Sequence, residues 1–289
     1  MTFTGTYTAL ITPFNADGSV DYPALRDFVQ WQVSCGVDGL VPVGTTGESP
    51  TLDVHDHIKV IATTVEAAEG KATVIAGTGA NATAEAIELT REVLGMGVQA
   101  TLQVTPYYNK PNSEGLFRHF SAIADLGLPV VLYNVPGRAG KEIPLEVVVK
   151  LAAHPNVAAI KEAAGSVERV SAIKDACELT VLSGDDSLTL PMISVGASGV
   201  ISVASNVIPK EMSALVRLAL ANDLAAAREL HRTYYPLFRD LFIDTNPIPV
   251  KTALAMMGRV GPVFRLPLCE PSDKIREQIC RTLRSLSLL

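Results

Sequence analysis

The sequence lacks the hydrophobic segments that membrane insertion or secretion requires. None of its apolar runs reaches the roughly 20 residues that a membrane-spanning helix needs. Its first residues, MTFTGTYTALITPF, lack the basic start and the long apolar core of a signal peptide. We therefore expect a soluble, cytoplasmic protein.

Cysteine is scarce, and its spacing offers no metal or redox motif. There is no CxxC pair and no histidine at metal-ligand spacing, and His55 and His57 fall on different sides of a predicted helix, at its surface. We expect no metal site. We also expect small buried apolar side chains in a reducing compartment at the four cysteines, Cys35, Cys177, Cys269 and Cys280.

Charge is sparse as well. Only 19% of the residues are charged, the net charge is −6, and no cluster of Lys and Arg could follow a phosphate backbone, which argues against nucleic-acid binding. Hydrophobic residues, in contrast, make up 48% of a chain of 289 residues, which is long enough for one large core. These proportions are typical of a globular enzyme.

Short apolar runs alternate with helical patterns along the first two thirds of the sequence. The runs are apolar on both faces, like strands buried on both sides, at 7–14, 39–44, 73–79, 100–108, 129–136, 157–163, 180–184 and 199–205. The helical patterns lie at 22–34, 54–68, 83–94, 114–124, 145–152, 167–176 and 187–195, and several end at a glycine, namely Gly36, Gly70, Gly95 and Gly127. About eight such units in roughly 200 residues predict an α/β fold, a closed parallel (β/α)8 TIM barrel rather than an open sheet.

The alternation stops after about residue 222. Three amphipathic helical patterns follow, at 224–242, 249–257 and 272–286, separated by turns rich in proline and glycine. Because no Ser/Gly linker intervenes, we expect residues 1–222 to form the catalytic barrel and residues 223–289 a small helical domain docked on it.

Reactive side chains gather where the predicted strands end. The loops after the strands of a barrel converge at one mouth, where barrel enzymes place their active sites. Here these positions carry the segments GTTGE (44–48), PYYN (106–109), YNVPGR (133–138), KE (161–162) and SGDD (183–186). The sequence therefore predicts an active site at this mouth.

Lys161 is the strongest indication of chemistry. It follows an apolar run, 157–160, in a strand that would otherwise be wholly buried. Desolvation disfavours the charged form of a lysine, and a neutral amine can attack a ketone to form an imine. The alternative is an ion pair with Glu162 or Asp185, although Glu162, as the adjacent strand residue, should point to the opposite face.

Four neighbouring residues could serve such an imine. Tyr133 could transfer protons at the end of the next strand, although such tyrosines often serve packing alone. Thr45 and Thr46, between glycines, could hold a small carboxylate or form an ordinary turn. Arg138 could bind a carboxylate through its planar guanidinium, or lie in solvent.

A tyrosine pair and two glycine-rich patterns are interpreted separately. In Tyr107-Tyr108 one ring should point inward and the other outward, toward a loop or a partner surface. The GxGxxA pattern at 77–82 matches a dinucleotide-binding loop, but the next strand ends without an acidic residue for a ribose. The loop 44–49 lacks the ending of a phosphate-binding loop, so we expect no nucleotide cofactor.

Six segments in this order, GTTGES, VTPYYN, YNVPGR, AIKEAAG, LSGDD and GVISVASN, closely resemble the dihydrodipicolinate synthase family, in the class I aldolase group that includes N-acetylneuraminate lyase. The resemblance covers nearly the whole chain, including NPIPVKTAL near its end. It implies a Schiff-base condensation of pyruvate with L-aspartate 4-semialdehyde to 4-hydroxy-tetrahydrodipicolinate, a step of lysine and diaminopimelate biosynthesis, without metal or organic cofactor.

The resemblance also implies a role for each matching residue. Lys161 would form the imine, and Tyr133 would donate and accept protons, linked through Thr45 to Tyr108 of a neighbouring subunit. The site would then require a dimer, and members of the family are commonly homotetramers of two tight dimers. The substrate-binding residues would be Thr46 for the pyruvate carboxylate, Arg138 for the semialdehyde carboxylate, and Gly184 and Ile201 along the pocket wall.

Members of the family that lysine inhibits bind it in a pocket at a subunit interface. Asn81, Glu85 and Tyr107 would supply the groups that a zwitterionic amino acid needs, whereas Val54 stands where inhibited members often carry a histidine. The resemblance therefore leaves feedback inhibition by lysine open. The other matching positions are Ser49, Pro50 and His57.

Two alternative functions differ in testable ways. A neuraminate or keto-deoxy sugar acid lyase of the same group would share Lys161, Tyr133 and the GTTGE loop but would need no arginine at position 138. A non-catalytic barrel that senses a small carboxylate would form no imine with pyruvate.

Overall fold

Eight parallel strands form a closed barrel in the computed structural model, which describes residues 3–289. Each strand pairs with its neighbours in sequence, and β1 closes the barrel by pairing with β8. The predicted (β/α)8 barrel is therefore confirmed. Its strands are β1 (Gly5–Ala9), β2 (Gly39–Val41), β3 (Thr73–Gly77), β4 (Ala100–Val104), β5 (Val130–Asn134), β6 (Val157–Glu162), β7 (Thr180–Ser183) and β8 (Gly199–Ser202).

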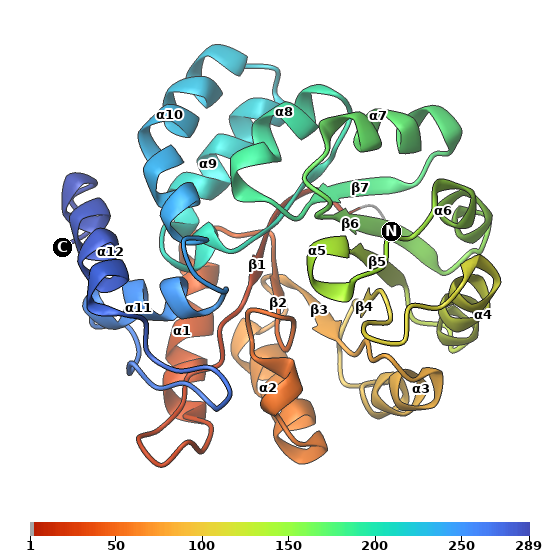
Figure 1. The fold of residues 1–289 in the computed structure, drawn as a ribbon, viewed down its shortest axis with the longest axis horizontal. Helices are drawn as coiled ribbons and strands as arrows, with labels where there is room; N and C mark the ends of the chain where they lie inside the picture. Colours follow the sequence, from red (N-terminus) through yellow and green to blue (C-terminus); the bar gives the residue numbers. More distant parts are fainter. Residues whose placement is uncertain (1–2) are drawn as a thin grey trace.

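Helices surround the barrel on all sides (Figure 1). They are α1 (Tyr22–Ser34), α2 (Val54–Ala68), α3 (Thr83–Glu92), α4 (Ser113–Ala124), α5 (Pro136–Ala139), α6 (Leu145–Ala152), α7 (Val167–Ala176), α8 (Thr189–Ser194) and α9 (Pro209–Leu220). Asp21, Asp53 and Asn112 cap the first turns of α1, α2 and α4 by accepting a backbone N–H bond. The glycines predicted to follow helices all have φ between 70° and 97°.

The predicted apolar runs are longer than the strands that they contain. The run at 7–14 was the least accurate prediction, because β1 begins at Gly5 and ends at Ala9. Leu10 and Ile11 beyond it are buried in the core without belonging to the strand. An apolar run reports burial, and residues 10–14 after β1 are buried like the strand itself. Helix α9 was not predicted, although its buried positions Met212, Leu215, Val216 and Ala219 have helical spacing.

Three further helices follow the barrel, as the sequence indicated, at α10 (Leu224–Asp240), α11 (Ile248–Met256) and α12 (Asp273–Ser285). Helix α10 packs on α9, and α12 packs on both α10 and α11 (Figure 1). Helix α11 is buried along most of its length and contacts the segment after β8. The domain boundary at residue 222 stays a prediction.

Successive side chains along each strand point to opposite faces, and they fill two separate cores, one inside the barrel and one between the strands and the helices. In β6, Ala159 belongs to the cluster inside the barrel and Ile160 to the cluster between the strands and the helices. Phe3 and Tyr7 close the floor of the interior, edge to face with their ring centroids 6.1 Å apart. The residue at position 161 therefore continues the inward series.

Exposure of the cysteines differs from the prediction. Cys269 is exposed and the other three are half-buried, and all four are free thiols. Cys35 and Cys177 lie at helix ends, Cys269 lies between α11 and α12, and Cys280 lies in α12, so the expectation of buried side chains was wrong. Among residues 3–289, no helix is long and apolar enough to cross a membrane.

Candidate active site

Lys161 points into the barrel near the end of β6. It pairs in register with Tyr133 of β5 and Leu182 of β7, and only 6% of its surface is exposed. Its Nζ lies 4.2 Å from the centroid of the Tyr133 ring. A Cβ at Gly184 would lie 2.6 Å from the Ala163 Cβ and 3.1 Å from the Lys161 Cε, so glycine leaves room for the lysine side chain.

Glu162 lies on the opposite face of β6, as strand alternation predicted. Its carboxylate accepts hydrogen bonds from Asn134 Nδ2 at 2.9 Å, Arg169 Nε at 2.8 Å and the Ala164 N–H at 2.9 Å. Burial raises the pKa of Glu162, and the charge of Arg169 partly offsets this effect. The carboxylate is therefore satisfied outside the barrel and does not pair with Lys161.

Asp185 does not form an ion pair with Lys161 either. Within residues 3–289, no carboxylate oxygen lies within 4.0 Å of the Lys161 amine. Burial raises the pKa of the Asp185 carboxyl, an effect that the charge of Lys161 partly offsets, and its Oδ2 is buried without a hydrogen-bond partner. The ion-pair interpretation of Lys161 is therefore not supported by the structure.

The loop after β2, residues 44–49, carries Thr45 and Thr46 and is firmly held. Glu48 has a left-handed φ of 58°, and its buried carboxylate accepts a hydrogen bond from Lys251 Nζ of α11 at 2.6 Å. The Arg265 N–H donates to the other Glu48 oxygen at 3.2 Å. Sequence reasoning missed both contacts.

Thr46 meets a second residue of the C-terminal region. Asn246 Nδ2 donates to the Thr46 Oγ1 at 2.9 Å, and the two residues are 5% and 3% exposed. The main-chain carbonyl of Asn246 accepts a hydrogen bond from the Arg138 guanidinium at 3.0 Å. Sequence reasoning singled out Thr46 and Arg138 but missed Asn246, whose one available signal was its place in the segment NPIPVKTAL.

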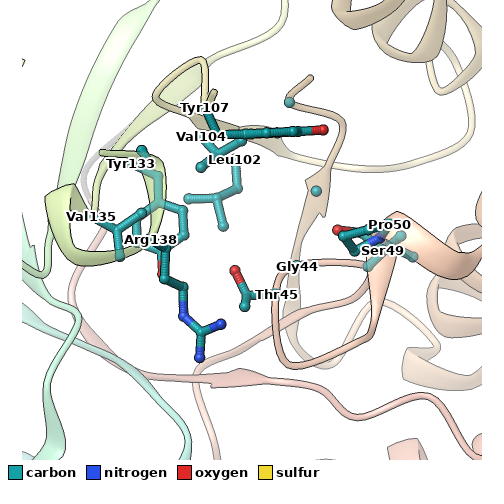
Figure 2. A pocket seen from close by; sticks show the side chains of 14 residues that line it. Gly44, Thr45, Ser49, Pro50, Leu102, Val104, Tyr107, Tyr133, Val135 and Arg138 are labelled. Atoms are coloured by element: carbon teal, nitrogen blue, oxygen red, sulfur yellow. The ribbon is translucent and has the colours of Figure 1, made fainter. Parts of the chain in front are cut away.

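A cavity of about 210 Å³ opens at the mouth of the barrel (Figure 2). Arg138 of α5 and Thr45 of the loop after β2 point into the same space, and Tyr133 forms part of the wall. Of the other predicted site residues, Tyr107 and Ser49 also line the cavity, whereas Lys161, Thr46, Gly184 and Ile201 do not. Lys161 is thus buried next to the cavity, with its amine against the Tyr133 ring that forms part of the cavity wall.

Tyr107 and Tyr108 point in different directions, as predicted. Tyr107 lines the cavity and is 37% exposed, whereas Tyr108 is 90% exposed and has a φ of 73°. Tyr108 does not line the cavity of its own chain. A non-glycine residue with such a φ carries backbone strain that its surroundings must hold in place.

The positions matched to a lysine pocket lie in part around Tyr107. Asn81 Nδ2 donates to the Tyr107 carbonyl at 3.2 Å. Burial raises the pKa of Tyr107, and the negative charge of Glu85 adds to the shift. His57, however, is buried, and its Nε2 donates to the Gly77 carbonyl at 2.7 Å. The surface position predicted for His57 was wrong, because the helix turns this ring toward β3.

The glycines of the GxGxxA pattern at 77–82 have a structural explanation. A Cβ at Gly77 would lie 2.3 Å from the Val43 carbonyl oxygen, and one at Gly79 would lie 2.4 Å from the Val104 nitrogen. These glycines therefore allow neighbouring strand ends to pack closely.

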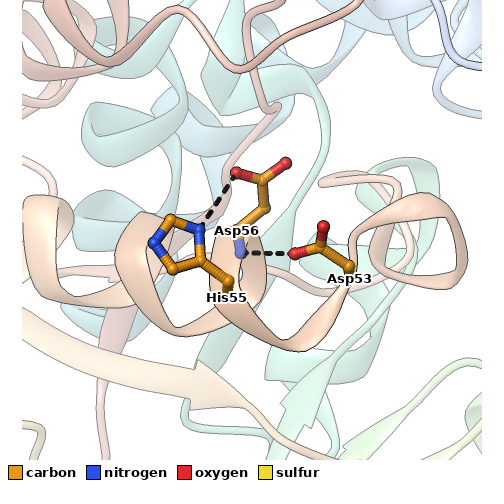
Figure 3. A group of neighbouring side chains, drawn as sticks. All are labelled: Asp53, His55 and Asp56. Carbon is orange, nitrogen blue, oxygen red and sulfur yellow. Dashed lines mark hydrogen bonds and ion pairs between the residues drawn. The ribbon is translucent and has the colours of Figure 1, made fainter.

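Asp53, His55 and Asp56 form a small group of potential metal ligands at the start of α2 (Figure 3). Asp53 caps the helix by accepting from the Asp56 N–H, and the Asp56 carboxylate is bound by Arg265 and Tyr22. The group is thus explained by capping and an ion pair.

Comparisons with known proteins agree on one family. The profile of the dihydrodipicolinate synthetase family matches residues 2–286. A 4-hydroxy-tetrahydrodipicolinate synthase from Thermodesulfovibrio yellowstonii is 47% identical over 290 aligned positions, which cover 99% of each chain.

Solved structures give the same result. The 4-hydroxy-tetrahydrodipicolinate synthase of Methylacidiphilum fumariolicum SolV is 52% identical, superposes with a TM-score of 0.97, and is matched over 99% of this chain and 96% of its own. A dihydrodipicolinate synthase from Acinetobacter baumannii, solved in complex with pyruvate, is 42% identical with a TM-score of 0.98 over 100% of both chains.

Proposed function

The chain belongs to the dihydrodipicolinate synthetase family, and on that premise we propose that it condenses pyruvate with L-aspartate 4-semialdehyde to 4-hydroxy-tetrahydrodipicolinate, in lysine and diaminopimelate biosynthesis. The observation that carries this proposal is the Lys161 amine, buried at the mouth of the barrel without an anionic partner in contact. The amine is not held in an ion pair, and it lies beside Tyr133, which lines the cavity where a keto acid would bind.

The reaction proceeds through an imine between Lys161 and pyruvate. Nζ attacks the keto carbon and water leaves; the imine then loses a methyl proton and becomes an enamine. The enamine carbon adds to the aldehyde of the semialdehyde, and the amino group of that substrate attacks the imine carbon, which closes the ring and releases Lys161. The imine nitrogen accepts the electron pair when the methyl proton leaves. In the addition step the enamine nitrogen returns that pair, the aldehyde oxygen accepts it with a proton, and the imine forms again. The steps therefore balance without an external oxidant or reductant.

Tyr133 is the proton donor and acceptor in this proposal. The contact of its ring with the Lys161 amine, at 4.2 Å, supports a place beside the imine. Thr45 links Tyr133 to Tyr108 of a neighbouring subunit in this proposal. Tyr108 is 90% exposed on its own chain and is therefore available to a partner. The active protein is accordingly a dimer at least, and a cytoplasmic homotetramer by analogy with its family.

Carboxylates are bound by Thr46 and Arg138, and Gly184 and Ile201 form the wall around pyruvate. Thr46 takes the carboxylate of pyruvate, and Arg138, which lines the cavity, takes that of the semialdehyde. Replacement of Arg138 by alanine should sharply lower turnover of the semialdehyde and leave imine formation with pyruvate intact. Unchanged turnover of the semialdehyde by Arg138→Ala would rule out this substrate, and cleavage of N-acetylneuraminate would be the next assay.

Borohydride reduction in the presence of pyruvate tests the proposed chemistry. Mass spectrometry should locate a pyruvate-derived adduct on Lys161 and none on Lys251, the other buried lysine. The Lys161→Ala variant should remain unmodified. A wild-type protein that forms no adduct would be a sensor or a binding protein rather than an enzyme of this class.

An inhibitor pocket for lysine is a further part of the proposal. Asn81, Glu85 and Tyr107 carry the hydrogen-bonding and charged groups, and Ser49 and His57 are further positions assigned to the pocket. Nε2 of His57 is used by the Gly77 carbonyl, so this ring can offer only Nδ1. Pro50 and Val54 complete the matching positions.

A further inference from the structure

Asn246 touches two of the proposed substrate-binding residues although it lies far from both in sequence. Its Nδ2 donates to the Thr46 hydroxyl oxygen at 2.9 Å, across 200 positions of the chain. Its carbonyl accepts from the Arg138 guanidinium at 3.0 Å. One buried residue of the segment before α11 therefore connects the two side chains assigned to the two substrate carboxylates.

The polarity of the Asn246–Thr46 hydrogen bond determines what Thr46 can do. A threonine hydroxyl has one proton to donate and two lone pairs with which to accept. Because the Asn246 amide donates, it uses a lone pair of the Thr46 oxygen and leaves the hydroxyl proton free. No acceptor within the described part of the chain takes that proton. The proton is therefore available to a carboxylate bound at Thr46.

The placement of Asn246 lowers the stability of the fold, which indicates that this residue serves something other than stability. The Asn246 Oδ1 is buried and has no hydrogen-bond partner, and such an orphaned acceptor costs free energy on folding. An apolar residue at this position would remove the orphaned oxygen. It would also remove the donor that keeps the Thr46 proton directed away from the C-terminal region.

We propose that Asn246 is a positioning residue for pyruvate: its amide holds Thr46 as an obligate donor, so that the hydroxyl proton is presented to the pyruvate carboxylate. This role rests on the proposed function, because it requires pyruvate to bind at Thr46. The main-chain carbonyl of Asn246 orients Arg138 independently of the side chain. A change of the side chain should thus affect pyruvate and spare the semialdehyde.

The Asn246→Asp variant tests the polarity directly. A carboxylate has nearly the shape of the amide but can only accept, so the Thr46 proton would turn toward position 246 and away from the ligand. The pyruvate concentration that gives half-maximal borohydride trapping of Lys161 should rise roughly 10- to 100-fold, as expected for loss of a hydrogen bond to a charged group. The rate at saturating pyruvate and the KM for the semialdehyde should change by less than about threefold.

Two further variants separate positioning from damage to the fold. Asn246→Ala removes the donor without adding a charge, so it should raise the half-maximal pyruvate concentration less than Asn246→Asp does. Asn156→Asp is the matched control, because the Asn156 amide also donates, to the Ala124 carbonyl at 2.9 Å, in the α4 region away from the cavity. It should leave pyruvate trapping unchanged even if it lowers the thermal midpoint.

A double-mutant cycle with Thr46→Val completes the test. If Asn246 acts through Thr46, the combination Thr46→Val/Asn246→Asp should need little more pyruvate than Thr46→Val alone. Additive effects, or an Asn246→Asp variant with wild-type trapping, would overturn the proposal. If the wild-type protein itself formed no adduct, the proposed function would fail first, and the two failures are thereby distinguished.

Discussion

The two loops on either side of the cavity are built in opposite ways. The loop after β2, residues 44–49, is buried at Thr46, Gly47 and Glu48 and is held by contacts from the C-terminal region, made by Asn246, Lys251 and Arg265. The loop after β4 points outward, with Tyr108 90% exposed and Tyr108 and Lys110 in left-handed conformations at φ values of 73° and 44°. One half of the site is thus fixed within the chain, and the other half is presented to the outside.

The difference between the two loops shows which part of the protein holds each half of the site. The C-terminal region acts on the anchored loop through a buried ion pair with Glu48 and an amide that donates to Thr46. The outward tyrosine carries backbone strain, and strained conformations of this kind cost of order 1–3 kcal/mol. In the proposed dimer a second copy of the chain receives Tyr108, which would account for its strained conformation.

The largest effect is expected from the anchored loop. Lys251→Met leaves the Glu48 carboxylate buried without its cation, which should lower the free energy of unfolding by about 3–5 kcal/mol. Urea denaturation measures this change. The Glu48→Gln/Lys251→Met double variant removes the unpaired charge and should recover part of the loss. A single variant as stable as the wild type would show that the anchor is dispensable.

The outward loop should respond in activity rather than in stability. Tyr108→Phe removes a relay hydroxyl, so turnover should fall about 100-fold, as for a positioned proton-transfer group. Because the side chain is 90% exposed, the free energy of unfolding should stay within about 0.5 kcal/mol of the wild type. Full turnover by this variant would remove Tyr108 from the mechanism.

A smaller effect should appear in the pH dependence of stability. Asp186, which follows β7, accepts hydrogen bonds from Ser202 Oγ and the N–H groups of Val203 and Ala204. Burial nevertheless raises its pKa from 3.8 to about 6. The native state then binds more protons than the unfolded state between these values, so stability should fall as the pH rises from about 4 to about 6.

Urea denaturation across this pH range, compared with Asp186→Asn, isolates the contribution of this carboxyl. In the Asp186→Asn variant, the fall in the free energy of unfolding that Asp186 contributes between about pH 4 and about pH 6 should be absent. Parallel pH profiles for the two proteins would show that Asp186 titrates near its ordinary pKa.

The smallest effect concerns the proposed lysine pocket beside Tyr107. Lysine at millimolar concentration should lower turnover, and Glu85→Gln should weaken the effect by removing the charge that attracts the ammonium group. Initial rates at increasing lysine concentration measure this. A flat dose response of the wild-type protein would contradict the pocket, and with it the assignment of Asn81 and Glu85.

Local patterns in the sequence predicted the barrel and the inward lysine, because strand alternation alone separates Lys161 from Glu162. They could not predict Asn246 or Lys251, since each acts on a residue 200 or more positions away. Periodicity also misplaced His57, because a polar ring in an amphipathic helix can be buried when a strand carbonyl accepts its proton. Ends of strands were misjudged where loops were buried, as after Ala9.

Mixing two inactive variants tests most directly whether the site is completed by a second copy. Lys161→Ala lacks the nucleophile and Tyr108→Phe lacks the relay hydroxyl, but a mixed dimer contains one site with both groups intact. After joint unfolding and refolding at equal amounts, half of the dimers should be mixed and one of their two sites active, so turnover should recover to roughly a quarter of the wild-type value. Activity no higher than the average of the two separate variants would contradict the account.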